Sequence, residues 1–402
     1  MTASALELAD IFRLHGPAYL DRYGASLSAV QRKALSDIAV CRTAALGGHV
    51  EQCDRCGHRT IAYSSCRNRH CPKCQGTARA AWLDRRAAEL LPVEYFHVVF
   101  TLPQLIAPVA LQNQRIVYSM LFRAAAETLL QIAADPRHLG ANIGFLAVLH
   151  TWGQNLQHHP HLHCLVPGGG LAPDRSRWIA CRRQFLLPVK VLSRVFRAKF
   201  ADSLHRAFLD GKLSFHGQLQ PLGEKQNFLS WLNRIVRSEW VVYAKPPFAG
   251  PHQVLKYLAR YTHRVAIANQ RLVALQNDHV SFHWKDYRRA GRPAVMTLQA
   301  NEFIRRFLLH VLPRGFVKIR HFGFLANRAR ADHIRLCRAL LGPASSNLAC
   351  EPEVTQQAAQ AQRCPLCREG CMQPVEILLP HVALRHRYRF ALPITAPRSN
   401  TS

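Results

Sequence analysis

Residues 158–170 read His158-His159-Pro160-His161-Leu162-His163-Cys164-Leu165-Val166-Pro167-Gly168-Gly169-Gly170, an apolar run with alternating histidines that ends in three glycines. Alternate residues of a β-strand point to the same face of its sheet, so His161 and His163 share one face of this predicted strand. Neutral imidazole is the commonest side-chain ligand for protein-bound metals. We therefore predict a buried strand that presents His161 and His163 as paired metal ligands.

The third ligand of this predicted metal site is left open by the sequence. His159 has the same strand parity as the histidine pair, although the adjacent Pro160 perturbs the strand. Three other donor side chains precede the strand, at His150, Gln154 and Asn155. We take His159 as the first candidate. The alternative interpretation is that these histidines have structural roles, as single histidines on strands more often do.

Further along the chain, the segment Lys256-Tyr257-Leu258-Ala259-Arg260-Tyr261-Thr262-His263-Arg264 places two tyrosines four residues apart among cations. On a helix this spacing puts Tyr257 and Tyr261 on one side. A tyrosine hydroxyl can attack a phosphodiester, and Arg260 and Arg264 could stabilise the phosphate or bind the DNA backbone. Tyr257 is therefore the predicted nucleophile. Tyr261 is either a second nucleophile or a core ring that continues an apolar stripe of Val254, Leu258 and Val265.

The chain is strongly basic, with 53 Lys+Arg against 24 Asp+Glu in 402 residues and a net charge of +29. Because the excess is spread along the whole sequence, nucleic acid is the expected partner. A hydrophobic content of 49% can form one large core or two to three smaller ones, which excludes a disordered basic protein. No apolar run approaches the ~20 residues that cross a bilayer, and the N-terminus lacks a signal-peptide pattern. We expect a cytoplasmic, nucleoid-associated protein with no membrane partner.

Two Cys-x-x-Cys steps, separated by a hairpin-sized segment, indicate a zinc module over residues 46–92. We predict one structural Zn²⁺ bound by the thiolates of Cys53, Cys56, Cys71 and Cys74, because a segment this small has too little core to fold without metal. Cys66, His58 and His70 are additional donors in the module. They leave open the exchange of one ligand for Cys66, or a second ion.

A third step, Cys364-Pro365-Leu366-Cys367, follows a linker-like stretch rich in Ala, Ser and Gln. Cys371, His381 and His386 lie beyond it, but they do not form another Cys-x-x-Cys pair. The sequence alone therefore leaves open whether these C-terminal cysteines bind a second zinc.

The apolar pattern of the rest of the chain predicts an α+β fold, with an antiparallel sheet flanked by helices. In addition to the histidine strand, strands are predicted at 95–103, 143–150 and 240–243. The strand at 143–150 is expected to form an antiparallel hairpin with the histidine strand. The expected helices are about 77–92, 110–134, 188–210 and 222–238, with a further strand pair at 280–287 and 294–298. We divide the chain into a helical lead-in (1–45), the zinc module (46–92), an α+β domain (93–290), a basic helical region (291–343) and a linker with a cysteine-containing tail (344–402).

Residues 301–342 are predicted to form basic helices with interleaved aromatic rings. Cationic side chains and aromatic platforms together suit single-stranded or hairpin DNA, and Arg328 and Arg330 are the chosen DNA-binding candidates. In the alternative interpretation the phenylalanines are core residues beneath a solvated basic surface.

Taken in order, these motifs resemble the two-tyrosine HUH transposases of the insertion-sequence-91 family. The resemblance covers nearly the whole chain. It rests on Cys66-Arg67-Asn68-Arg69-His70-Cys71-Pro72-Lys73-Cys74, on His150-Thr151-Trp152-Gly153-Gln154-Asn155 followed by the histidine strand, and on the two-tyrosine segment. The stretch Arg320-His321-Phe322-Gly323-Phe324-Leu325-Ala326-Asn327-Arg328 is similar to the basic C-terminal region of that family.

The resemblance implies that residues 93–290 form the HUH nuclease and strand-transferase domain of a bacterial rolling-circle transposase. His161 and His163 would bind Mg²⁺ or Mn²⁺, while Tyr257 and Tyr261 would form 5′-phosphotyrosine with DNA. The implied partners are single-stranded or hairpin DNA at the ends of an insertion sequence, and its target DNA. The oligomeric state, including a homo-oligomer, is open.

Two other functions compete with this interpretation. A rolling-circle replication initiator or relaxase shares the paired histidines and the tyrosine chemistry, but the N-terminal zinc module and the lack of a Walker A motif in the sequence argue against it. A non-catalytic zinc-dependent nucleic-acid-binding protein requires the histidine and tyrosine motifs to be accidental. Covalent capture of single-stranded DNA distinguishes the catalytic interpretations from the last one.

Overall fold

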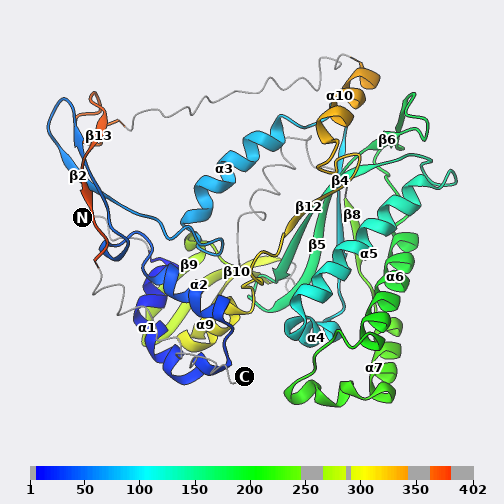
Figure 1. The fold of residues 1–402 in the computed structure, drawn as a ribbon, viewed down its shortest axis with the longest axis horizontal. Coiled ribbons are helices and arrows are strands. Elements are labelled where there is room, and N and C mark those ends of the chain that lie inside the picture. Colours follow the sequence, from blue (N-terminus) through cyan, green and yellow to red (C-terminus); the bar gives the residue numbers. More distant parts are fainter. Residues whose placement is uncertain (1–5, 246–265, 287–290, 343–362, 382–402) are drawn as a thin grey trace, which may run out of the picture. The chain divides into compact units, whose positions relative to one another are not determined.

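The computed structural model describes residues 6–245, 266–286, 291–342 and 363–381. The chain divides into two compact units (Figure 1), of which the first comprises residues 1–76, 267–311 and 354–402 and the second residues 77–266 and 312–353. Both contain helices and antiparallel strands, which confirms the predicted α+β class.

A five-stranded antiparallel sheet is the centre of the second unit (Figure 1). Its strand order is β12-β4-β5-β3-β8, so β5, the histidine strand, lies in the middle. The predicted hairpin of β4 and β5 is confirmed, and β3 pairs with the other edge of β5. The bounds of the strands are β3 (Tyr95–Thr101), β4 (Gly144–Trp152), β5 (His158–Pro167), β8 (Val242–Lys245) and β12 (Ile319–Gly323).

One face of this sheet carries the main hydrophobic core, which includes the inward side chains Phe100, Leu149 and Leu162. The apolar sides of the helices pack there, with Phe100 and Phe196 in edge contact at 5.0 Å between ring centroids. The helices of this unit that contribute to the core are α4 (Ala107–Gln112), α5 (Gln114–Ala134), α6 (Val189–Leu209) and α7 (Lys225–Arg237).

Helix α5 is apolar and long enough to cross a membrane by length and composition alone. The prediction that no apolar run approaches this length is therefore wrong for residues 114–134. However, 67% of its most apolar stretch is buried inside the protein, where Val117, Leu121 and Leu129 belong to the main core. Burial of this kind identifies α5 as a core helix of the second unit.

The opposite face of the sheet has a smaller apolar cluster next to the histidines. Trp82 of α3 (Cys74–Ala87) packs there against Leu146, Val148 and Leu165. This face is the one that presents His161 and His163, because odd-numbered residues of β5 alternate with the core-facing Leu162 and Cys164. Among the described residues this unit also contains the small hairpin β6 (Gly169–Leu171) and β7 (Trp178–Ala180), and the helix α10 (Arg330–Leu341).

The first unit combines the N-terminal helices with a distant part of the chain. Phe12 of α1 meets Phe307 of α9 edge-on at 5.3 Å, and Phe282 of β10 meets Phe303 at 5.8 Å. The elements of this part are α1 (Leu8–Tyr23), α2 (Ala29–Ala39), α9 (Ala300–Leu308), and a sheet of β9 (Leu272–Gln276), β10 (His279–Asp286) and β11 (Arg292–Gln299).

A second three-stranded sheet of the first unit joins the two ends of the chain. The hairpin of β1 (Gly48–Cys53) and β2 (Arg59–Tyr63) accepts β13 (Met372–Leu378) along the free edge of β1, in the order β13-β1-β2. The pairing of β1 with β13 is antiparallel and runs from Gly48 opposite Leu378 to Cys53 opposite Met372.

The predicted basic helices over 301–342 are confirmed only in part, because a strand lies between two helices. The structure has a helix, α9, then the strand β12 and then another helix, α10, and it divides them between the units. Within the first unit α1 packs with α9 and β13 pairs with β1, so segments far apart in the sequence lie together. Apolar contacts between segments far apart in the sequence decide this arrangement. The predicted division into five segments stays a prediction.

Candidate metal centres

Three histidines come together on the sheet of the second unit. His150 of β4 and His161 and His163 of β5 each offer one ring nitrogen, and these atoms all lie within 4.8 Å of one another. The ring centroids of His150 and His163 are 4.2 Å apart, and those of His161 and His163 are 4.8 Å apart. We call this set the histidine cluster. Its donor atoms are close enough to share one cation.

The strand register explains why His150 belongs to the histidine cluster. His150 lies directly opposite His161 in the β4–β5 ladder, and directly opposed side chains lie on the same face of a sheet. The register shifts between His150 and Trp152, and the Trp152 ring stacks on the His150 ring at 4.7 Å. The stacked indole limits the orientations open to the imidazole of His150.

Hydrogen bonds orient the two histidines of β5. The Nδ1–H of His161 donates to the carbonyl oxygen of His159 at 2.6 Å, which leaves Nε2 of His161 as its ligand atom. Nδ1 of His163 shares a hydrogen bond of 2.7 Å with Nε2 of His97 on β3. Partners of this kind fix the ring orientation and the tautomer of metal-binding histidines.

Burial keeps these imidazoles neutral. It lowers the pKa of His161 and of His97 to about 4, and it lowers the pKa of His163 well below the ordinary value. Neighbouring imidazoles add to the effect on His163, because a second positive charge next to the first is unfavourable. Near pH 7 His161 and His163 are therefore neutral, which is the form of histidine that binds metal.

The structure brings together only part of the predicted nuclease site. His161 and His163 meet as predicted, but His159 is not in the cluster and instead contributes its carbonyl oxygen to His161. Of the upstream candidates His150, Gln154 and Asn155, His150 belongs to the histidine cluster, and Asn155 uses its side-chain oxygen to accept the backbone N–H of Gln157. His97 was not identified from the sequence as the hydrogen-bond partner of His163. The alternating burial pattern of β3 places His97 on the same face of the strand as Val99.

Four predicted site residues lie outside the described residues. These are the two tyrosines and the two arginines of their segment: Tyr257, Tyr261, Arg260 and Arg264. Their roles stay predictions.

The cysteines of the first unit form two separate groups of four, each with all sulfurs within 4.8 Å of one another. The N-terminal cluster contains Cys41, Cys66, Cys71 and Cys74, with three Sγ–Sγ distances of 3.6 Å. The closing cluster contains Cys53, Cys56, Cys364 and Cys367, with Sγ–Sγ distances of 3.7 and 3.6 Å.

The predicted grouping of Cys53 and Cys56 with Cys71 and Cys74 is therefore not what the structure shows. Cys53 and Cys56 lie at the tip of the β1–β2 hairpin, whereas Cys66 follows the other end of β2. A five-residue strand spans about 17 Å, so the tip and the base of the hairpin are too far apart to share one ion. Cys41, after α2, was missed because no Cys-x-x-Cys step marks it.

Asn68 holds the loop of the N-terminal cluster against α2. Its side-chain N–H donates to Asp37 of α2 at 2.8 Å, and its side-chain oxygen accepts the backbone N–H of His70 at 2.9 Å. His70 is buried against Asn68, and neither His70 nor the predicted extra donor His58 belongs to either cysteine cluster.

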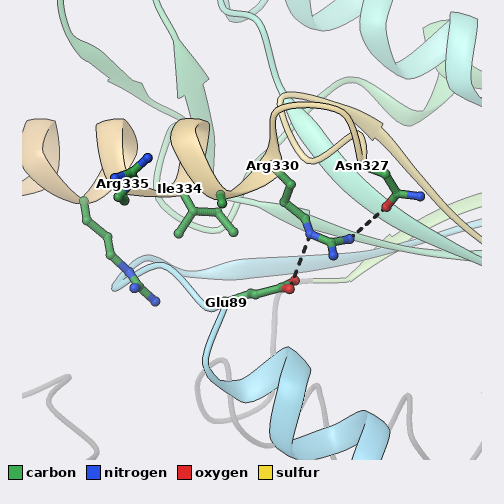
Figure 2. Close-up of a pocket in the computed structure, with 7 residues that line it drawn as sticks. Glu89, Asn327, Arg330, Ile334 and Arg335 are labelled. Carbon is green, nitrogen blue, oxygen red and sulfur yellow. Dashed lines mark hydrogen bonds and ion pairs between the residues drawn. The ribbon is translucent and has the colours of Figure 1, made fainter.

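Of the predicted DNA-binding arginines that lie within the described residues, Arg328 is exposed and Arg330 is partly buried. Figure 2 shows Arg330 reaching from the start of α10 to Glu89 and Asn327, at 3.3 Å and 3.0 Å. These residues line a cavity of about 370 Å³, together with Ala331, Ile334, Arg335 and Arg338. Arg330 is therefore engaged in holding α10, whereas Arg328 presents its charge to solvent.

Comparisons with known proteins agree with this description. Residues 11–102 match the family described as "Transposase zinc-binding domain", and residues 144–332 match the family described as "Putative transposase". The second match contains the histidine cluster, and the first contains six of the cysteines in the two clusters.

Two curated relatives extend over most of the chain. "Putative transposase y4qJ" of Sinorhizobium fredii is 57% identical over 385 residues, which is 94% of this chain and 96% of that protein. "Transposase for insertion sequence element IS801" of Pseudomonas savastanoi pv. phaseolicola is 27% identical over 76% of this chain and 72% of that protein. No solved structure matches the chain significantly. The chain is a transposase with a zinc-binding domain, and it belongs to the insertion-sequence-91 family.

Proposed function

We propose that this transposase cuts and rejoins one DNA strand at a time, with a divalent ion at the histidine cluster and a tyrosine nucleophile. The observation that carries the proposal is the convergence of His150, His161 and His163 on one face of the central sheet, with His161 and His163 held neutral by burial. A net charge of +29 supports a nucleic-acid substrate.

The donor set of the histidine cluster fits a divalent transition metal. Three imidazole nitrogens suit Mn²⁺ better than Mg²⁺, which is a hard ion that prefers oxygen ligands. When bound, such an ion would polarise the scissile phosphate and neutralise its developing charge. His97 would position His163 through their 2.7 Å hydrogen bond, and the carbonyl of His159 would position His161.

In the proposed reaction the hydroxyl oxygen of Tyr257 attacks the phosphorus in line. The bond from phosphorus to the 3′ oxygen breaks as the bond to tyrosine forms, and the phenol proton leaves as the 3′ oxygen takes up a proton. The products are a 5′-phosphotyrosine and a free 3′-OH. A second 3′-OH can attack the phosphotyrosine and restore a phosphodiester, so strand transfer requires no ATP. Single-stranded or hairpin DNA at the ends of the element is the proposed substrate.

The test is covalent capture. The purified protein is incubated with Mn²⁺ and single-stranded oligonucleotides from the flanks of its element, and a denaturing gel is used to detect a protein–DNA adduct. We expect an adduct with wild type and none with Tyr257→Phe, which keeps the ring and removes the hydroxyl. The variant should still bind the oligonucleotide. An adduct that maps by peptide mass to a residue other than Tyr257 or Tyr261 would contradict the proposed mechanism.

A further inference from the structure

The closing cluster joins residues from the two ends of the sequence, since Cys53 and Cys367 are 314 positions apart and Cys56 and Cys364 are 308 apart. We infer that Cys53, Cys56, Cys364 and Cys367 form a second structural zinc site, separate from the N-terminal cluster, and that this site fastens the C-terminal segment to the β1–β2 hairpin. The matched zinc-binding region ends at residue 102 and so contains only half of these ligands.

The sulfur geometry fits a tetrahedral ion. Four sulfurs at the usual Zn–S distance of about 2.3 Å lie about 3.8 Å apart on a tetrahedron. The Sγ–Sγ distances of 3.7 Å between Cys53 and Cys367 and 3.6 Å between Cys56 and Cys364 agree with this spacing. A disulfide would require about 2.05 Å, and all four cysteines are free.

Backbone N–H groups surround the sulfurs of the closing cluster. The N–H groups of Arg55 and Cys56 approach Sγ of Cys53 at 3.4 and 3.5 Å, and the N–H of Gly370 approaches Sγ of Cys367 at 3.4 Å. The first turn therefore directs backbone N–H groups at Sγ of Cys53, and the second turn directs one at Sγ of Cys367. Such hydrogen bonds stabilise a thiolate, which is the form of cysteine that binds zinc.

The two turns also fit closely against each other. A Cβ atom at Gly370 would lie 2.4 Å from Sγ of Cys53 and 2.6 Å from Oδ1 of Asp54, so only glycine fits at this position. Asp54 accepts the N–H of Cys371 at 2.8 Å through Oδ1, and its own N–H donates to the carbonyl of Cys371 at 3.1 Å. The C-terminal turn is therefore built to complete the N-terminal one.

Among the described residues, the other contacts of the C-terminal segment with the hairpin include two exposed ion pairs, Arg55–Glu369 and Arg59–Glu376, which contribute little stability. Apart from its first residue, Met372, the side chains of β13 are exposed or half-buried, with Ile377 at 81% exposure. Pairing β13 with the edge of β1 closes a loop of some three hundred residues, and the chain loses conformational entropy when this loop closes. Favourable free energy from another source is needed to offset that loss. Metal binding supplies that free energy, because a structural zinc site contributes its binding energy to folding.

Metal content tests the inference directly. By elemental analysis, the double variant Cys364→Ser/Cys367→Ser should contain one zinc ion per chain fewer than the wild-type protein. The matched control is Cys371→Ser, since Cys371 is in the same turn but belongs to neither cluster; it should keep the wild-type zinc content. A double variant with the wild-type zinc content would overturn the inference.

A second measurement on the wild-type protein does not depend on the folding of a variant. The native protein is alkylated and the labelled cysteines are mapped by peptide mass, before and after a zinc chelator. Cys56 is exposed, so burial alone does not protect its thiol. We expect Cys53, Cys56, Cys364 and Cys367 to resist labelling together and to react together when zinc is removed. Rapid labelling of Cys56 before chelation would refute the site.

Discussion

The variant Tyr261→Phe, which removes only the hydroxyl group, distinguishes two interpretations of the tyrosine segment. If Tyr261 is a second nucleophile, Tyr261→Phe should leave single cleavage of a short oligonucleotide nearly intact but abolish the joining of two ends. If Tyr261 is a core ring, the variant should behave like wild type in both assays, because phenylalanine keeps the packing. The measurement is the ratio of joined to cleaved product on sequencing gels. Equal loss of both products would exclude both interpretations.

At the histidine cluster, we predict that His150→Ala weakens Mn²⁺ binding by more than about 100-fold, because it removes one of three ligands. His159→Ala is the matched control. Its ring is outside the cluster and only its backbone carbonyl is used, so Mn²⁺ affinity should change by less than about threefold. Binding is measured by calorimetry with each variant. A larger loss with His159→Ala would restore His159 as the third ligand.

The sequence was sufficient to predict the pair His161 and His163, because strand parity is a local property. It could not choose His150 over His159, since that choice depends on the β4–β5 register and on the bulge near Trp152. The cysteines also show that local spacing does not determine contacts between distant segments. Cys-x-x-Cys spacing predicted that Cys53 lies near Cys56 and Cys364 near Cys367, but only the fold shows that these two pairs form one cluster.

Strand β12 is an element whose stability should depend on pH. Arg86 donates to Nε2 of His321 at 3.0 Å, so that imidazole is an acceptor and is neutral. Burial, together with the charges of Arg330 and Arg86, lowers the pKa of His321 from 6.5 to about 4. The unfolded chain then binds more protons between these pH values. The free energy of unfolding should be highest above pH 6.5 and should decrease as the pH falls through this window.

His321→Gln tests this contribution, because glutamine can accept the same hydrogen bond without titrating. One pKa unit corresponds to about 1.4 kcal/mol, and partial exposure of His321 reduces the expected effect to the order of 1 to 2 kcal/mol. Denaturant unfolding at about pH 7.5 and pH 5 gives the difference between wild type and variant. The variant should lose less stability at the lower pH. Identical losses would show that His321 is not responsible.

The end of β12 makes a second prediction for this element. Gly323 has a φ of +61°, and a Cβ atom there would lie 1.8 Å from the carbonyl oxygen of Ile143. Gly315 has a similar φ of +72° but has no neighbour within 4 Å of its Cβ position. We predict that Gly315→Ala destabilises the unit by about 1 kcal/mol through backbone strain, and Gly323→Ala by at least about 2 kcal/mol. Thermal unfolding of both variants measures the difference, and equal effects would contradict a tight β12–β4 junction.

Most elements of the second unit could be predicted from apolar periodicity, including β3, the β4–β5 hairpin, α6 and α7. Strand β12 could not. Its sequence, Ile319 to Gly323, is short and basic, and it resembles the helical segments around it. It becomes a strand because the edge of β4 offers a ladder and because Phe322 stacks on Phe145 at 5.1 Å. This is tertiary context overriding local propensity.

For the whole molecule, the positive charge should make DNA binding strongly salt-dependent. Each phosphate neutralised on a single strand contributes about −0.7 to the slope of log K against log salt. Arg328 is exposed, so Arg328→Ala should make the slope shallower by about 0.7 with no loss of stability. Arg330 is paired with Glu89 and Asn327, so Arg330→Ala should lower the unfolding temperature and change the slope less. Binding of a labelled oligonucleotide over a salt series, with thermal unfolding of each variant, tests both. The reverse pattern would place Arg330 on the DNA path and Arg328 outside it.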